Sequence, residues 1–310
     1  MKFSRPAIIH NPVGGSARPE MISALVAAFA AQGITGCRLY PTGPEPQSAN
    51  TNAHAAIAEG ADLLIAVGGD GTVKEVASAA MFHELPMAAY QGGTGNQFAN
   101  YFYPRLPAAD FCKMLIEGEP QKLDVLELRL WKDSSNGDGT QQSSTQFCIV
   151  GACSGSIAEA ISKAPRFWKR IFGKLVYFWR VVLACLNPKR DKIKLYFKGG
   201  ETHEQELLTL AIFNVDRTPL LELAPACNAS DGLVDLVCFE AKNVFQILST
   251  CFWLLLKRPF KTPYFKHRRV EELSIRAEKP IHFNVDGEEE DAAAIDVKVL
   301  PGALRMIVSA

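Results

Sequence analysis

The stretch Leu63-Leu64-Ile65-Ala66-Val67-Gly68-Gly69-Asp70-Gly71-Thr72-Val73 decides the fold of this chain. Its apolar start is typical of a buried strand, and it ends in three glycines around one carboxylate, before a helical stretch. Glycines at a strand-to-helix turn let the backbone approach a ligand and present bare N–H groups, and phosphate is the usual ligand. Because Asp70 would repel a phosphate, the pattern predicts that Mg²⁺ or a reacting hydroxyl lies between them.

Two further turns follow strands in the same part of the chain. One is Gly92-Gly93-Thr94-Gly95-Asn96, and the other is Asn11-Pro12-Val13-Gly14-Gly15-Ser16. The second can donate hydrogen bonds to phosphate, but no Gly-Lys-Ser/Thr follows, so it is not a Walker loop. A single glycine turn is often required for local reasons alone, whereas glycine turns after two neighbouring strands indicate nucleotide-dependent phosphoryl transfer.

Length and composition limit the class of protein. A chain of 310 residues is long enough for two domains, because one hydrophobic core seldom grows past about 250–300 residues. Its 48% apolar and 21% charged residues are typical of a globular protein. The 33 basic and 33 acidic side chains cancel, so nucleic acid is not an expected partner, and membrane contact must come from local clusters.

The cysteines and histidines exclude other chemistry. The eight cysteines are scattered without a Cys-x-x-Cys pair, and no signal peptide precedes them, so we expect a reducing cytoplasm. No two histidines have metal-ligand spacing, so zinc catalysis is not expected.

Residues 1–125 alternate between strands and helices with short links, which predicts an α/β domain with a doubly wound parallel sheet. Ligands on such sheets bind at the carboxyl ends of the strands, where the glycine turns fall. The expected strands are 7–10, 37–40, 63–67 and 87–90, and the expected helices are 21–31, 53–58 and 73–80.

Residues 126–310 contain many strands and few helices, which predicts a second, mainly antiparallel, sandwich-like domain. The polar segment 132–144 is expected to be a surface loop, and the sequence leaves open whether the last strand returns to the first domain. The expected strands, the first of which crosses the boundary, are 123–130, 146–150, 192–197, 207–213, 233–239, 270–276, 281–285 and 295–300.

The three strand-end motifs together resemble the diacylglycerol kinase catalytic domain, which bacterial soluble lipid kinases share with sphingosine kinases. The resemblance extends through the C-terminal half. Ala229-Ser230-Asp231-Gly232-Leu233-Val234-Asp235 is similar to the family's Asp-Gly-Leu metal loop, and Phe283-Asn284-Val285-Asp286-Gly287-Glu288 is similar to its Asp-Gly-Glu catalytic turn. The match continues through Pro301-Gly302-Ala303-Leu304-Arg305. It implies ATP bound between an α/β domain and a β-rich domain, with transfer of the γ-phosphate to a lipid hydroxyl.

The resemblance also implies a role for individual residues. A lipid hydroxyl is a poor nucleophile, so a carboxylate should accept its proton, and the family favours Glu288 with Asp286 as its partner. Asp70 is expected to act on the phosphates through Mg²⁺, Asp124 to join the metal–water network, and Asp231, with the carbonyls of Leu233 and Asn228, to form a structural cation site. The implied nucleotide-binding residues are Asn11, Gly15, Ser16, Thr42, Gly68, Gly69, Gly71, Thr72, Gly93, Thr94 and Asn96.

Some residues depart from the family pattern. Gln97 stands where many of these lipid kinases carry an aspartate, and its amide cannot neutralise Mg²⁺. The segments 151–155 and 214–221 also differ from the family, which leaves the acceptor pocket open.

Two apolar stretches, 171–186 and 245–256, lie beside lysines and arginines. Neither provides the roughly 20 mainly apolar residues that a membrane span needs. Each is typical of a helix at an anionic lipid surface, of a core helix with a basic end, or of the lining of an acyl groove. The expected protein is a cytoplasmic lipid kinase of phospholipid metabolism, peripherally bound to a membrane.

Two other functions remain open. One is a kinase of a soluble acceptor, because NAD kinases share the Gly-Gly-Asp-Gly-Thr turn. The other is a non-catalytic lipid-binding protein on the kinase fold, which Gln97 leaves open because it stands in place of an aspartate. The sequence does not distinguish diacylglycerol, phosphatidylglycerol or a sphingoid base as the acceptor, and it does not indicate the oligomeric state.

Overall fold

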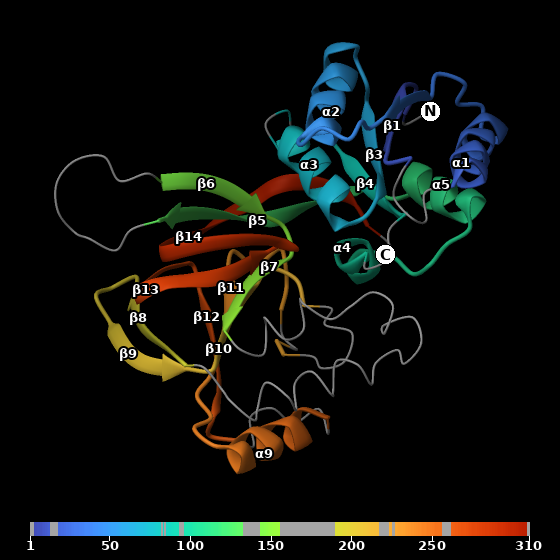
Figure 1. Cartoon of the computed structure of the whole chain (residues 1–310). Coiled ribbons are helices and arrows are strands. Elements are labelled where there is room, and N and C mark those ends of the chain that lie inside the picture. The colour runs from blue at the N-terminus through green and yellow to red at the C-terminus, as the bar shows by residue number, and fades with distance from the viewer. Residues whose placement is uncertain are drawn as a thin grey trace. The chain divides into compact units, whose positions relative to one another are not determined.

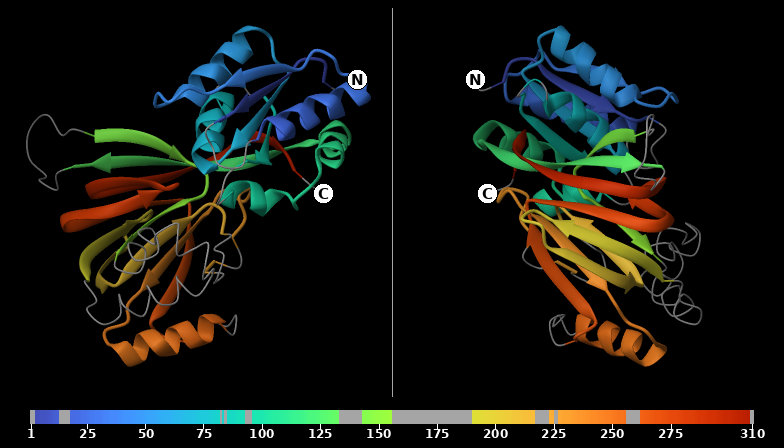
Figure 2. Two further views of the ribbon diagram at one scale, coloured as in Figure 1. Left: turned by 45° about the vertical axis from the view of Figure 1, so that its right-hand side comes forward. Right: turned by 90° about the vertical axis from the view of Figure 1, so that its left-hand side faces the viewer.

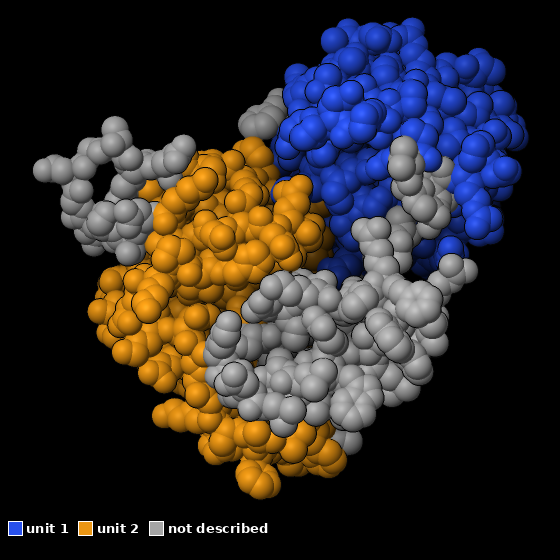
Figure 3. Space-filling model, viewed as in Figure 1, with its two compact units in different colours: residues 1–125, 301–310 blue, residues 126–300 orange. Residues whose placement is uncertain are grey.

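The computed structural model describes residues 3–12, 18–81, 83, 85–92, 96–132, 143–155, 190–216, 223–224, 227–255 and 262–308. Contacts within the chain divide it into two compact units, coloured separately in Figure 3. Unit 1 comprises residues 1–125 and 301–310, and unit 2 comprises residues 126–300. The chain therefore returns to unit 1 at its C-terminus.

Unit 1 contains a parallel sheet (Figure 1). Its strands run in the order β2 (Arg38–Pro41), β1 (Pro6–His10), β3 (Leu63–Gly68) and β4 (Met87–Gln91), and Met306 of β14 (Glu288–Ile307) pairs in parallel with Met87. Every residue of β3 is buried, as expected for a central strand covered on both faces. The predicted parallel α/β architecture is confirmed.

Helices cover the two faces of this sheet. α2 (Ser48–Ala58) packs with α3 (Asp70–Met81), and α1 (Pro19–Ala31) packs with α5 (Ala108–Glu117) on the opposite face (Figure 1). A short α4 (Gln97–Phe102) follows β4. α1 begins before the predicted residue 21 because the fixed φ of Pro19 suits a first helical turn.

Unit 2 is a mainly antiparallel sheet in the order β12-β11-β10-β7-β13-β14. Strand β8 of the β8–β9 hairpin pairs with β13, and β6 pairs with β5. A single described helix, α9 (Val244–Leu255), follows β11. The strands are β5 (Pro120–Trp131), β6 (Ser143–Cys148), β7 (Gly151–Gly155), β8 (Asp191–Phe197), β9 (Thr202–Leu207), β10 (Thr209–Phe213), β11 (Val234–Phe239), β12 (Phe265–Val270), β13 (Glu272–Val285) and β14.

The strands of unit 2 differ from the prediction in several places. β7 and β9 were not predicted, because β7 is bounded by glycines and β9 is mostly polar, and β14 extends on both sides of the expected strand 295–300. The expected strand 207–213 corresponds to β10, and its first residue, Leu207, is the last residue of β9. The expected strands 270–276 and 281–285 overlap one long strand, β13, whose pairing register shifts between Arg276 and Ile281. This irregularity accommodates Pro280, which has no N–H for a regular ladder. β12 was not predicted because its centre is charged.

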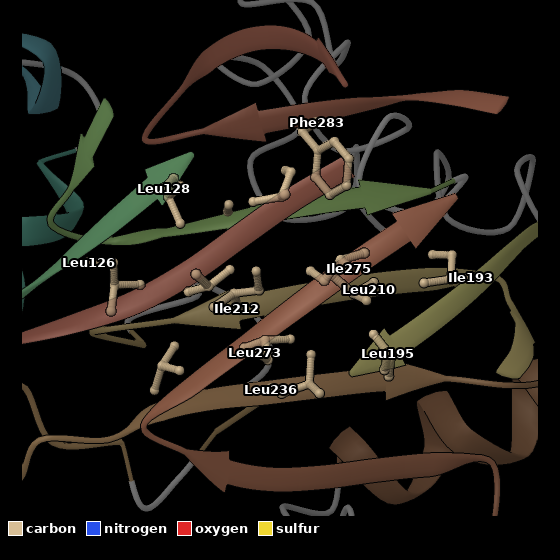
Figure 4. Close-up of a cluster of buried hydrophobic side chains, with 14 of the residues drawn as sticks. Leu126, Leu128, Ile193, Leu195, Leu210, Ile212, Leu236, Leu273, Ile275 and Phe283 are labelled. Carbon is tan, nitrogen blue, oxygen red and sulfur yellow. The ribbon is translucent and has the colours of Figure 1, made fainter. Parts of the chain in front are cut away.

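The core of unit 2 comes from alternate residues of its strands (Figure 4). Pairs such as Ile193 and Leu195, or Leu273 and Ile275, point to the same buried side because residues two apart share a face of a strand. Phe283, at the end of β13, is also in this core. The packed framework therefore extends to the turn that carries the Asp-Gly-Glu motif.

Candidate active site

Backbone hydrogen bonds join the carboxyl ends of the strands in unit 1. The N–H of Asn11 donates to the carbonyl of Val67 at 3.1 Å, and the N–H of Thr42 donates to that of His10 at 2.9 Å. The N–H of Gly92 donates to the carbonyl of Gly68 at 3.2 Å. The residues that follow β1, β2, β3 and β4 therefore gather at one edge of the sheet.

Glycine is required at this edge because the backbones lie close together. A Cβ on Gly68 would lie 2.5 Å from Oγ1 of Thr72, and one on Gly92 would lie 2.8 Å from the nitrogen of Gly68. A Cβ on Gly71 would meet no atom of the described residues within 4 Å. Gly68, Gly69 and Gly71 are not among the glycines with positive φ. The turn therefore needs glycine for lack of space, and it leaves open backbone beside Gly71.

The Gly92→Ala substitution is expected to destabilise unit 1 by roughly 1–3 kcal/mol, because the added methyl group must push the ends of β3 and β4 apart. Chemical denaturation measures the change. Gly71→Ala is the matched control, since its methyl group enters open space. Equal losses in the two variants would contradict this steric account.

Two buried polar atoms at this edge have no hydrogen-bond partner among the described residues. They are Oγ1 of Thr42, a residue only 8% exposed, and Nδ1 of His10. Burial lowers the pKa of His10, which keeps its ring neutral at neutral pH. An unpaired buried hydroxyl costs about 1–3 kcal/mol. These atoms are therefore candidate contacts for a bound ligand, and His10 was not predicted.

The Thr42→Val substitution separates binding from folding. It removes a hydroxyl that has no partner among the residues that the structure describes, so stability should be unchanged or slightly higher. If the hydroxyl contacts the nucleotide, ATP affinity should fall about fivefold to tenfold, as expected for one lost hydrogen bond. Titration calorimetry and thermal unfolding measure the two effects. Unchanged ATP affinity would remove Thr42 from the site.

Asp70 connects two of the turns. It is half-buried in the first turn of α3, and its Oδ1 accepts a hydrogen bond from the N–H of Phe98 at 3.1 Å. Phe98 lies in the first turn of α4, after Asn96, whose φ is 50°. The carboxylate thus fixes the segment that follows β4. Gly93 and Thr94 in that segment, like Gly15 and Ser16 after β1, lie outside the described residues.

Asp124 has a backbone contact in unit 1. It is 3% exposed, and its Oδ1 accepts a hydrogen bond from the N–H of Gly302 at 2.8 Å. Gly302 has a φ of 61°, which favours glycine. Asp124 therefore holds the bend of β14 against β5, and its place in a metal–water network stays a prediction.

In unit 2, the Asp-Gly-Glu motif is the turn of a hairpin. Val285 pairs with Glu288, and the two residues between them, Asp286 and Gly287, have φ values of 50° and 94°. Positive φ at both positions indicates the type I′ turn, for which Asp-Gly is a favoured sequence. Oδ1 of Asn284 accepts the N–H of Gly287 at 3.1 Å. The side chain of Glu288 is exposed at the start of β14.

Asp286 turns inward and accepts four hydrogen bonds. Its donors are the N–H groups of Ile149 at 2.8 Å, Val150 at 2.9 Å and Gly151 at 3.0 Å, and the thiol of Cys148 at 3.1 Å. Burial raises the pKa of this carboxyl, while the hydrogen bonds lower it and offset part of the effect. Because its oxygens are already engaged, Asp286 anchors the turn, and Glu288 has the accessible carboxylate.

The Asp231 loop carries an ion pair in this structure. Oδ1 of Asp231 accepts the N–H of Leu233 at 3.0 Å, and Oδ2 bonds to Nη2 of Arg269. Asp235, which is fully buried, bonds to Nε2 of His267. Within the described ranges, no three His, Cys, Asp or Glu residues are grouped to hold a metal ion. The structural cation site remains a prediction, with Arg269 beside its proposed carboxylate.

Arg269 and His267 belong to the basic run 257–269 that follows the apolar stretch 245–256, and the composition of that run does not indicate a partner for either residue. In β12 they pair with β11, and being two residues apart they share one face. Lys266 and Arg268 also have partners, Glu240 and Glu201. Oδ1 of Asn228 accepts the N–H of Ser230 at 3.2 Å, so it stabilises the same loop.

Two family models match the chain. Residues 5–128 match the diacylglycerol kinase catalytic domain, and residues 150–308 match the YegS C-terminal NAD kinase beta sandwich-like domain. Among curated proteins, "Putative lipid kinase SAS0691" of Staphylococcus aureus (strain MSSA476) is 25% identical over 258 residues, which cover 81% of this chain and 78% of that protein. "Putative lipid kinase SaurJH9_0749" of Staphylococcus aureus (strain JH9) is 24% identical over the same length.

Solved structures share the fold. "Crystal structure of a putative diacylglycerol kinase from Bacillus anthracis str. Sterne" superimposes with a TM-score of 0.79 at 21% identity and covers 100% of this chain and 96% of that chain. "A putative diacylglycerol kinase from Bacillus anthracis str. Sterne" has a TM-score of 0.73 at 20% identity and covers 100% and 98%. Together with the two family models, these matches confirm the resemblance seen in the motifs: the chain belongs to the diacylglycerol kinase catalytic-domain family of kinases.

Proposed function

We propose that this protein is an ATP-dependent lipid kinase that transfers the γ-phosphate to the hydroxyl of a membrane lipid. The observation that carries the proposal is the exposed carboxylate of Glu288, held on a rigid turn that Asp286 anchors by four hydrogen bonds. A fixed and accessible carboxylate is suited to orient an acceptor hydroxyl and take its proton. Membership in this kinase family supports the same reaction.

The glycine edge of unit 1 is the proposed nucleotide site. Among the described residues, the backbone beside Gly71 is open and the hydroxyl of Thr42 has no partner, and both fit a ligand that accepts hydrogen bonds, as phosphate and ribose oxygens do. Asp70 supplies a carboxylate at this edge. Mg²⁺ is commonly held by one or two carboxylates together with substrate phosphates, so it would arrive with ATP and neutralise phosphate charge.

In the proposed reaction, the acceptor oxygen forms a bond to the γ-phosphorus, and the bond from that phosphorus to the bridging oxygen of ADP breaks. The hydroxyl proton passes to Glu288. Asp286 keeps the turn in place and exchanges no proton, because its oxygens are occupied by backbone and thiol donors. We propose that the reaction takes place at the cytoplasmic surface of a membrane. Among the described helices, none is long and apolar enough to cross one.

A kinase of a soluble acceptor is the second candidate, and the description of the C-terminal family model as NAD kinase beta sandwich-like favours it. ATP labelled at the γ-phosphate, incubated with the protein and either detergent-dispersed lipid extract or water-soluble acceptors such as NAD, separates the two. We expect the label in the organic phase after extraction. Label that stays in water on a soluble acceptor would overturn the proposal. ATP left unused with both acceptors would favour a non-catalytic lipid-binding protein.

A further inference from the structure

The helix α9 is firmly attached to unit 2 by one side. Ile247 is fully buried in a cluster with Leu208, Phe239 and Ala241. On the same side, Oγ1 of Thr250 hydrogen-bonds to the carbonyl of Gln246 at 2.9 Å and to Oγ1 of Thr262 at 3.0 Å. Figure 2 shows the helix in orange at the lower end of both views. Its orientation within unit 2 is therefore fixed by packing.

The other side of α9 is apolar and exposed. Phe245 is 84% exposed, Phe252 is 56% exposed and Leu248 is 47% exposed. Their spacing of three and four residues puts them on one stripe of the helix. Val244 and Ser249 are also exposed, and the helix contains no charged residue. In the described part of the chain, the other large exposed hydrophobic side chains are Leu39 and Tyr196.

A surface helix normally has a polar outer face, so this stripe is unusual. Contiguous exposed apolar side chains mark a binding surface, because transfer of apolar surface out of water lowers the free energy. At 12 residues, the helix is shorter than the roughly 20 residues needed to span a bilayer. It is suited to lie in the plane of a lipid surface with its apolar side down.

The charge around the helix favours an anionic surface. Residues 241–270 contain no aspartate or glutamate. Lys242 is exposed just before the helix, and Arg190 donates hydrogen bonds to the carbonyls of Ala241 and Lys242. The sequence continues after the helix into Lys257, Arg258 and Lys261, which lie outside the described residues.

We propose that the outer face of α9 docks this protein on an anionic membrane, with Phe245, Leu248 and Phe252 entering the boundary between headgroups and acyl chains. Lys242, which is exposed just before the helix, contacts lipid phosphates and strengthens the attachment. The choice of a membrane as partner rests on the proposed function, because a kinase whose acceptor is a membrane lipid must reach that surface. The lining of an acyl groove, which the sequence also leaves open for this stretch, does not suit this stripe, since Phe245 is 84% exposed.

Sedimentation with vesicles tests the proposal without ATP. The full-length protein should bind vesicles of phosphatidylcholine and phosphatidylglycerol better than vesicles of phosphatidylcholine alone, and salt should weaken the binding. The triple variant Phe245→Ser, Leu248→Ser, Phe252→Ser should bind the anionic vesicles more weakly by a factor of about ten or more, because it lacks the apolar area that enters the lipid. The matched control is Leu39→Ser with Tyr196→Ser, which removes exposed apolar side chains elsewhere and should bind normally.

Equal vesicle binding by the wild type and the triple variant would overturn the proposal, as would a wild type that does not bind. A wild-type dimer that the triple substitution converts to a monomer, with no vesicle binding in either, would assign the face to a second copy of the chain. A lower unfolding temperature of the triple variant would assign it to another segment of the chain. Phosphorylation of detergent-dispersed lipid is measured separately, so a failure of docking is distinct from a failure of the kinase proposal.

Discussion

The Glu288→Gln substitution is expected to lower turnover by about 10²–10⁴-fold, the usual contribution of a general base. Glutamine keeps the shape of the side chain but cannot accept the proton of the lipid hydroxyl. ATP affinity should be nearly unchanged, because the substitution alters the acceptor side of the reaction. Steady-state rates with detergent-dispersed lipid and calorimetric titration with ATP measure the two quantities.

Glu289→Gln is the matched control for this prediction. Glu289 is the exposed neighbour of Glu288 on β14, and its carboxylate lies 3.7 Å from Nε2 of His282. Because successive side chains of a strand point to opposite faces, it should not reach the same acceptor. A Glu288→Gln enzyme with normal turnover would place the base elsewhere and leave the hairpin turn with a structural role.

The Asp286→Asn substitution is expected to act mainly on stability. Its backbone φ of 50° suits asparagine, so the turn itself is retained. However, the NH₂ group of asparagine replaces one carboxylate oxygen and cannot accept a hydrogen bond from the N–H donors that it faces. Each buried donor left unpaired costs roughly 1–3 kcal/mol. Denaturant unfolding should show this loss, and turnover should fall because Glu288 is no longer held in place.

Asp291→Asn is the control for stability on the same hairpin. Asp291 is exposed, and its Oδ1 lies 2.9 Å from Nδ1 of His282, so loss of its charge should lower stability by no more than about 1 kcal/mol. If Asp286→Asn unfolds like the wild type and yet loses turnover as Glu288→Gln does, Asp286 takes part in the chemistry and its anchoring role is wrong.

The two carboxylates of this motif show where sequence interpretation ends. The residues Asp-Gly between strands predict a hairpin turn, but they do not indicate which carboxylate turns inward. That depends on the N–H groups of Ile149, Val150 and Gly151, which are distant in sequence. The sequence therefore identifies the motif, and the family resemblance favours Glu288 as the base. The structure adds that Asp286 is the residue that turns inward.

The parallel sheet of unit 1 was predictable because β1, β3 and β4 are short apolar runs followed by glycine turns. The burial of individual side chains could not be predicted in the same way. The apolar stretch 245–256 fits a core helix, a surface helix or a groove equally well, since periodicity does not specify what covers each face. The packing of Ile247 and the exposure of Phe245 distinguish its two sides.

The basic run 257–269 shows a similar limit. Composition groups its lysines and arginines, but the pairing of β12 with β11 brings Arg269 to Asp231 and His267 to Asp235. Such pairs depend on strand register, which a sequence with charged residues on both faces specifies weakly.

Mass spectrometry of a lipid extract after incubation with the protein, ATP and Mg²⁺ shows whether the protein phosphorylates a lipid. A lipid kinase should yield a new lipid that is heavier by one phosphoryl group. This product should form with the wild type and with Glu289→Gln, and it should be nearly absent with Glu288→Gln. Consumption of ATP without any phosphorylated lipid would show that the protein is not a lipid kinase, and an equal yield from Glu288→Gln would show that Glu288 is not the base.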